Sequence, residues 1–253
     1  MEELWKDWPR ELWRSLRRRI GLPASSDVRI LSDMLRSLLK LAPEQQNSLV
    51  SAVISYPSIV GLYDEDISDA AEFLGVRAMK GNHLYQPREI VAAYAGHSMG
   101  LCENYKNKDK CIDEGLQLPS RHTLLVEYTE DALLLQGDVL REAIDFADAD
   151  IDADASFILG SNNSQSEGHA QRVKDFVLQF LRNRYLSEGP PGLILLIMVG
   201  RPGSVGDETV QNAILDAIWQ LGSKANIITS MPGYVAARGA AEFAWRAQNT
   251  LYK

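Results

Sequence analysis

The sequence predicts a layered α/β domain with a mixed sheet. Helical segments alternate with short apolar strands through the second half of the chain, as in residues 167–221. Residues 193–199 (LILLIMV) are too few to cross a bilayer and are typical of a buried strand. Two β-rich segments on either side of residues 129–131 predict a hairpin with a tight turn. Buried strands that alternate with helices, together with a hairpin, indicate this fold class.

The elements can be placed by periodicity and by their end signals. Residues 64–74 begin with acids suited to a helix N-terminus and end at Gly75. Residues 167–185 place five apolar side chains on one face, which predicts a long amphipathic helix. Further helices are expected at 28–42, from 87, at 207–221 and at the end of the chain, and strands at 50–56, 76–79, 123–128, 132–136, 149–159, 193–199 and 226–229.

Composition limits the class of protein. The chain has 253 residues, enough for one large domain or two small lobes with a sizeable core. Its net charge of −8 argues against nucleic acid as a partner, because phosphate contacts need a basic surface. Two cysteines, Cys102 and Cys111, flank a Lys-rich loop, and we expect no disulfide framework from them. With no apolar signal core near the start, we expect a cytoplasmic protein.

The first twenty residues are amphipathic and locally basic. One face would carry Trp5, Trp8, Leu12, Trp13 and Leu16, with arginines around it. Such a helix could lie on an anionic membrane. A terminal helix that docks on its own domain is the more common case, so we expect a membrane role to be unlikely.

The segment Gly96-His97-Ser98-Met99-Gly100 matches G-x-S-x-G, the nucleophile elbow of α/β-hydrolases. A serine hydrolase that uses Ser98 is therefore an alternative hypothesis. Its context is unfavourable, because the preceding segment predicts a helix and the residues after Gly100 are polar. The last histidine is His169, whereas the hydrolase order places the catalytic histidine late in the chain.

Two further patterns are weak metal signals. Zinc-type ligands occur at His97, Cys102, Cys111 and His122, but none of the spacings is a short chelating pair. Acids at 148, 150, 152 and 154 resemble the start of a calcium loop, but Ala153 and Leu159 stand where the loop needs Gly and Glu. We expect no metal site, and an edge strand with an acidic outer face instead.

Residues 199–206 (VGRPGSVG) form a Gly-rich loop between a buried strand and a helix. Glycines let backbone approach a ligand, and a following helix N-terminus favours anions. The loop matches neither the P-loop motif nor G-x-G-x-x-G. An ordinary strand-to-helix loop would have the same kind of sequence.

Four segments in order resemble the actin-like ATPase superfamily (ribonuclease H-like architecture), especially the nucleotide-binding domain of DnaK-type heat-shock chaperones. One of them, Val199-Gly200 before a helix, resembles the adenosine loop of that family. Residues 51–57 (SAVISYP) and the helix after them are similar to the strand that ends in Val-Pro-Ala in that family. Residues 86–94 (QPREIVAAY) are similar to its Glu-Pro-Thr-Ala-Ala-Ala helix, so that GHSMG is merely the end of this helix. Residues 232–241 (PGYVAARGAA) resemble the closing helix of that family. Their sequence is also similar to that of a fungal branch of chaperone-like proteins.

The resemblance implies where a nucleotide would bind. Gly200, Arg201, Gly203 and Gly239 would lie on the adenosine side, with ATP or ADP as the possible ligand. Gln86 stands where the family has a glutamate that organises water and metal. The small residues of the last helix would permit close packing beside this cleft.

The departures from the family bear on activity. The hairpin of the first phosphate loop is not found, so the N-terminal lobe is expected to be incomplete. The second phosphate loop would fall at residues 127–132 (EYTEDA), where no glycine remains. Glu130 and Asp131 would repel phosphate by about 1–4 kcal/mol, depending on the local dielectric. Phosphoryl transfer depends on positioning and charge neutralisation, and these parts are missing.

We therefore expect three segments: an N-terminal basic helix at 1–26, the rest of a first lobe at 27–118 and a second lobe at 119–253. The predicted function is a catalytically inactive, chaperone-like scaffold or binding protein with at most residual adenine-nucleotide binding. Its partner would be an unidentified protein or client. An active ATPase with a phosphate site built from other residues is a third hypothesis.

Overall fold

A computed structural model describes residues 4–41, 51–59, 61–79, 86–143 and 152–251. Its centre is a five-stranded sheet with the strand order β5-β4-β3-β6-β7. The strands are β3 (Arg121–Tyr128), β4 (Leu133–Leu140), β5 (Asp152–Ser156), β6 (Leu193–Gly200) and β7 (Lys224–Ile228).

The topology of this sheet confirms the predicted fold class. β4 runs antiparallel to both β3 and β5, whereas β6 is parallel to β3 and β7 is parallel to β6. Counted along the chain, the strands lie in the order 3-2-1-4-5 with only the second reversed. This is the mixed α/β sheet of the ribonuclease H-like architecture on which actin-like ATPases are built.

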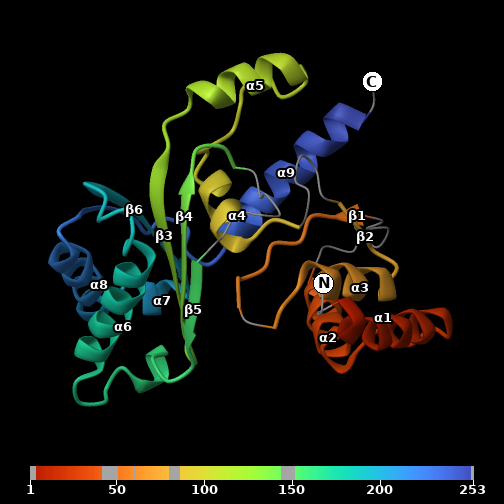
Figure 1. The fold of residues 1–253 in the computed structure, drawn as a ribbon, viewed down its shortest axis with the longest axis horizontal. Coiled ribbons are helices and arrows are strands. Elements are labelled where there is room, and N and C mark those ends of the chain that lie inside the picture. Colours follow the sequence, from red (N-terminus) through yellow and green to blue (C-terminus); the bar gives the residue numbers. More distant parts are fainter. Residues whose placement is uncertain (1–3, 42–50, 60, 80–85, 144–151, 252–253) are drawn as a thin grey trace.

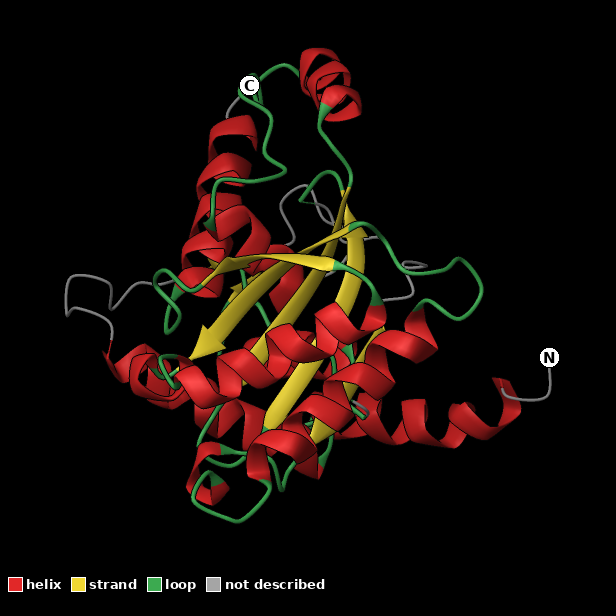
Figure 2. Cartoon of the chain, turned by 90° about the vertical axis from the view of Figure 1, so that its left-hand side faces the viewer, coloured by secondary structure: helices red, strands yellow, loops and turns green. Residues whose placement is uncertain are grey.

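Helices cover both faces of the sheet (Figure 1). α6 (His169–Arg184) and α8 (Glu208–Leu221) pack on one face, where they bury Leu124, Val126 and Ile194 with the rest of the larger core. Figure 2 shows these two helices crossing in front of the strands. α4 (Glu89–Gly96) and α9 (Val235–Leu251) cover the other face, over Leu125, Leu195 and Ile197. Strand alternation thus supplies one apolar set to each layer.

The α4–α9 crossing is a direct backbone contact that depends on glycine. A Cβ added to Gly239 would lie 1.8 Å from the Ala92 carbonyl oxygen, and one added to Gly96 would lie 2.0 Å from the Val235 carbonyl oxygen. Both distances are far below van der Waals contact, so neither position accepts a larger residue without a shift of a helix. The small residues of α9 are therefore required by the approach of another helix.

The first part of the chain forms a smaller body beside α4 and α9. It consists of α1 (Leu4–Arg19), α2 (Ser26–Leu41), α3 (Asp64–Phe73) and a two-stranded parallel sheet of β1 (Ser51–Ala52) and β2 (Arg77–Ala78). α2 packs on α3 through a small apolar cluster that includes Val28 and Ala70. The strands expected at 50–56 and 76–79 are present but short.

α1 docks on α3 through charged groups. Arg14 is 4% exposed and donates to Asp66 Oδ1 at 2.7 Å and to Asp69 Oδ2 at 2.6 Å. Arg18 donates to Asp69 Oδ1 at 2.8 Å. The N-terminal helix does dock on its own domain, but by its polar side rather than by its apolar face. No helix in the described part of the chain is long and apolar enough to cross a membrane.

The cysteines are paired in one local bridge, although the sequence analysis expected no disulfide framework from them. Cys102 and Cys111 are bonded to each other, with Cα atoms 5.2 Å apart, and the bond ties the loop after α4 to α5 (Lys108–Gln117). The spacing rules used on the sequence address multi-disulfide frameworks and do not detect one local bridge. Disulfides are rare in the cytosol, so this pair gives no support to the expected cytoplasmic location.

The helix crossing yields a stability prediction. We expect Gly239→Ala to lower the free energy of unfolding by about 1–3 kcal/mol or more, because its Cβ overlaps the α4 backbone. Gly203→Ala is the matched control, since a Cβ there has no atom within 4 Å, and it should change stability by less than about 0.5 kcal/mol. Urea denaturation followed by circular dichroism measures both. Equal stability of the two variants would contradict the packing described here.

Candidate functional site

The candidate site lies at the sheet edge where β3, β6 and β7 end. In open α/β sheets, ligands bind beyond the carboxyl ends of the parallel strands. Three segments meet at this edge: the turn at 129–131 after β3, α7 (Pro202–Val205) after β6, and residues 229–234 before α9. This is the position that the family resemblance predicts for a nucleotide.

Gly200 joins these segments at the end of β6. Its φ of 131° lies in a region open chiefly to glycine, and an added Cβ would be 2.2 Å from the Tyr128 carbonyl oxygen. Its N–H donates to the Pro232 carbonyl at 3.0 Å. The glycine is thus needed for the close approach of β3, and its N–H is engaged within the protein.

The β3–β4 turn is closed on itself and covered. Thr129 N donates to the Ala132 carbonyl at 3.0 Å, and Ala132 N donates to Thr129 Oγ1 at 3.0 Å. The carbonyls of Thr129 and Glu130 accept from the backbone N–H groups of Ser161 and Asn162, each at 2.9 Å. A phosphate loop must direct backbone N–H groups at its ligand. Here two of those donors are engaged inside the turn.

The backbone on the covering side is equally close. A Cβ on Gly160 would lie 2.3 Å from the Glu130 carbonyl oxygen, so residues 160–162 rest directly on the turn. Ser161 Oγ also lies 3.1 Å from Ser204 Oγ of α7. These contacts link the turn, the segment after β5 and α7 into one packed corner.

An ion pair crosses this corner. Arg201 Nη1 forms a salt bridge with Glu130 Oε1, which joins the loop after β6 to the β3–β4 turn. Both side chains are exposed, so the pair adds little to stability. Its importance is positional, because the cation predicted to lie on the adenosine side faces a carboxylate. Gly203 lies beside it, exposed and with no atom within 4 Å of an added Cβ.

Below the corner, on the face covered by α4, two half-buried glutamates form a pair whose inner carboxyl oxygens are shielded from solvent. Glu89 begins α4, and Glu127 is the penultimate residue of β3. Burial, and then the neighbouring Glu127 carboxylate, raise the pKa of Glu89 well above its usual value. Burial also raises the pKa of Glu127. Of the two, Glu89 holds its proton more strongly, and its carboxyl group donates a hydrogen bond to Glu127.

The pair leaves polar atoms unmatched. Oε2 of Glu89, Oε2 of Glu127 and Nε2 of Gln136 are buried without a hydrogen-bond partner in the described part of the chain. Gln136 Oε1 is close to the start of α4, where it accepts from Ile90 N at 3.4 Å. Sequence reasoning missed this cluster. The available signal was Glu127 itself, a lone acid in the otherwise apolar or neutral strand segment 123–128.

The remaining sites predicted on the family resemblance are placed as follows. Gln86 is fully buried; its Oε1 accepts from Ile54 N at 2.8 Å and its Nε2 donates to the Met79 carbonyl at 3.0 Å. Its own N–H donates to Asp64 Oδ1 at 2.7 Å. Gln86 thus ties three segments together, and both ends of its amide are engaged. Gly239 is buried beneath α4, away from any open surface.

Ser98 does not stand at a strand-to-helix turn. It follows the last residues of α4, is exposed and has a φ of 60°. In the described residues its hydroxyl has no hydrogen bond to a histidine. Burial, and then Arg238, lower the pKa of the adjacent His97, while His169 lies within 3.2 Å of the Tyr128 hydroxyl on the opposite face of the sheet. The geometry of a nucleophile elbow is therefore not present.

The two weak metal signals have structural explanations. Cys102 and Cys111 are bonded to each other and so are not free to ligate zinc. Asp152 and Asp154 are exposed on β5, an edge strand as predicted, while positions 148 and 150 lie outside the described residues. Among the described residues there is no group of three or more His, Cys, Asp or Glu side chains arranged to hold a metal ion.

Comparison with known proteins gives little further information. No protein-family model matches the chain, and no curated protein matches it. One similar solved structure is the PilM–PilN type IV pilus biogenesis complex, with 9% identity and a TM-score of 0.42. The similarity covers 74% of this chain and 57% of that chain, which is less than two thirds of its length. At this identity and TM-score it assigns neither a family nor a function to this protein.

The carboxyl pair makes stability depend on pH. Because its folded-state pKa is raised, the folded pair holds a proton that the unfolded chain releases above about pH 4.3. The free energy of unfolding therefore falls as pH rises from there through the folded pKa. We expect Glu89→Gln to remove this loss and to raise Tm at neutral pH, with a smaller gain at about pH 4.

Thermal melts of both proteins across this pH range measure the effect. Glu208→Gln is the matched control, since Glu208 begins α8 as Glu89 begins α4 but is exposed. It should leave the pH profile unchanged. A Glu89→Gln protein with the parent's pH profile would show that the pair ionises normally.

Proposed function

We propose that this protein is a non-hydrolysing, chaperone-like scaffold of actin-like architecture, whose corner at the nucleotide position does not hold a triphosphate. The observation that carries the proposal is the β3–β4 turn. Two of its N–H groups are engaged internally, two of its carbonyls are covered, and its Glu130 pairs with Arg201. The partner in this proposal is a protein client, in keeping with the resemblance to DnaK-type chaperones.

Charge supports the same conclusion. Glu130 and Asp131 lie on the turn itself. Phosphoryl transfer needs fixed donors and cations around the phosphates. Here the turn carries two carboxylates, and Arg201, the cation at the loop, already faces Glu130. A bound triphosphate would have to compete with Glu130 for Arg201 while it lies against like charge.

Any residual nucleotide binding would involve the adenosine side. Gly200 ends β6, Arg201 follows it and Gly203 lies in α7; Arg201 and Gly203 are exposed there. ADP carries less charge than ATP, so it would be tolerated better at this corner. We infer that adenine nucleotides bind weakly at most and are not hydrolysed.

The experiment is a calorimetric titration with ATP and Mg²⁺, compared with ADP, followed by a phosphate-release assay. We expect no binding in the micromolar range and no turnover above a blank. The proposal fails if Mg²⁺-dependent hydrolysis is found and is reduced by Arg201→Glu but not by Arg182→Glu. Arg182 is a suitable control because it is also exposed and lies on α6, away from this corner.

The serine-hydrolase alternative has its own test. Because Ser98 follows a helix and has no histidine hydrogen-bonded to it in the described residues, we expect no labelling by a fluorophosphonate probe. Heat-denatured protein gives the background signal. Labelling of the native protein that disappears in Ser98→Ala would favour the hydrolase and overturn this expectation.

A further inference from the structure

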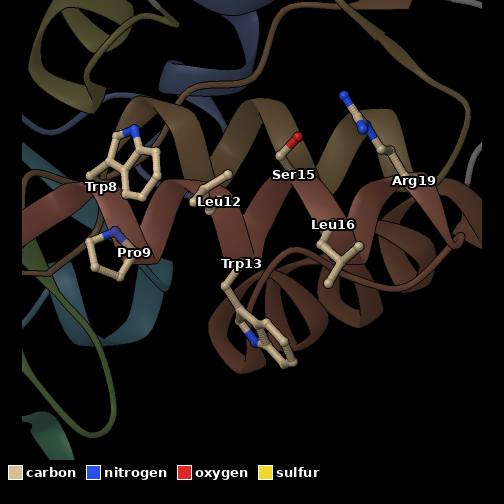
Figure 3. Close-up of a pocket in the computed structure, with 7 residues that line it drawn as sticks. All are labelled: Trp8, Pro9, Leu12, Trp13, Ser15, Leu16 and Arg19. Atoms are coloured by element: carbon tan, nitrogen blue, oxygen red, sulfur yellow. The ribbon is translucent and has the colours of Figure 1, made fainter.

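α1 presents its apolar face outward. Figure 2 shows the helix next to the N-terminus projecting from the body of the molecule. Trp8 is 64% exposed, Leu12 51% and Trp13 59%, and Leu16 is also exposed. Figure 3 shows these four side chains along one side of the helix, with Arg19 at its end. An isolated exposed leucine is ordinary, but a contiguous stripe with two tryptophans marks an interaction surface.

The opposite side of α1 fixes this orientation. Arg14 is buried between Asp66 and Asp69, and Arg18 shares Asp69. Rotating the helix to bury its tryptophans would expose Arg14 and leave two buried carboxylates of α3 without a cation. Removing one partner of a buried ion pair leaves an uncompensated buried charge and is strongly destabilising. The outward apolar face is therefore held in place by specific contacts.

Charge identifies what this face fits. α1 carries six Lys and Arg residues against one Asp and one Glu, although the whole chain has a net charge of −8. In the described part of the chain, no carboxylate lies within ion-pair distance of Arg17 or Arg19. A second copy of this helix would bring like charges together, whereas an anionic surface would attract α1 and repel much of the remaining chain.

We propose that α1 lies in the plane of an anionic lipid surface, with Trp8, Leu12, Trp13 and Leu16 inserted at the level of the headgroups. Interfacial helices of this kind combine Trp and Leu on one face with Lys and Arg around it. Tryptophan favours the membrane–water interface. The dock on α3 then holds the rest of the protein above the surface. This inference is independent of the nucleotide site.

The test is sedimentation of the full chain with vesicles of phosphatidylcholine alone or with about 30% phosphatidylglycerol. We expect binding to the anionic vesicles, weaker binding to the neutral ones, and loss of binding at high salt because screening shortens the reach of the arginines. Tryptophan emission should shift to shorter wavelength when anionic vesicles are added.

Matched variants locate the surface. Trp8→Ser with Trp13→Ser should reduce binding at least tenfold, whereas Trp219→Ser should not, since Trp219 is even more exposed but lies on α8. Arg17→Gln with Arg19→Gln should weaken binding to anionic vesicles by about fivefold per cation. Arg182→Gln with Lys224→Gln is the control for charge. Circular dichroism and Tm establish that each variant is folded.

Three results would overturn the proposal. The first is no binding to either kind of vesicle. The second is binding that persists in the Trp8→Ser, Trp13→Ser protein. The third is a dimer by light scattering that this double variant dissociates while vesicles do not bind, which would assign the face to a second copy of the chain.

Discussion

The contact between the α4 and α9 backbones is the constraint on which the rest of the structure depends. Gly96 and Gly239 let a carbonyl oxygen of one helix contact the glycine Cα of the other. The two helices therefore pack together on the same face of the sheet. The position of α4 then fixes what lies at its ends. Its first residue brings Glu89 to Glu127, and its last residues set the exposed turn that carries Ser98.

The sheet edge at the ends of β3 and β6 combines close backbone packing with exposed carboxylates. Gly200 still permits the close approach of β3 and β6. Around it, carboxyl groups and internal hydrogen bonds occupy the positions from which a phosphate site would present free donors. The glycines at this edge are required by the packing of the fold, whereas ligand-binding groups are not, so the fold by itself does not assign a ligand.

Local patterns in the sequence identified most of the elements, although not α5 (Lys108–Gln117), where only a Lys-rich loop was expected, and they did not identify the contacts between elements. The amphipathic helix at 167–185, the hairpin around 129–131 and the buried run at 193–199 follow from periodicity within each segment. The pairing of Glu89 with Glu127 does not follow from local periodicity, because it depends on where α4 packs against β3. The orientation of α1 could not be predicted either. Periodicity distinguishes the apolar face of the helix from its polar face, but it does not show that Arg14 pairs with Asp66 and Asp69. The disulfide between Cys102 and Cys111 could not be predicted without the geometry of the turn after α4.

The central position of β3 also has a consequence for the order of folding. β3 and β4 are joined by a turn of a few residues, so this pairing is local and closes quickly. β3 and β6 pair between His122 and Ile194, across on the order of seventy residues, and the entropy of closing that loop must be met before the parallel pair forms. The hairpin is thus suited to be an early template, and the edge that carries Gly200 and Arg201 is completed only when the slower, long-range pairing is made.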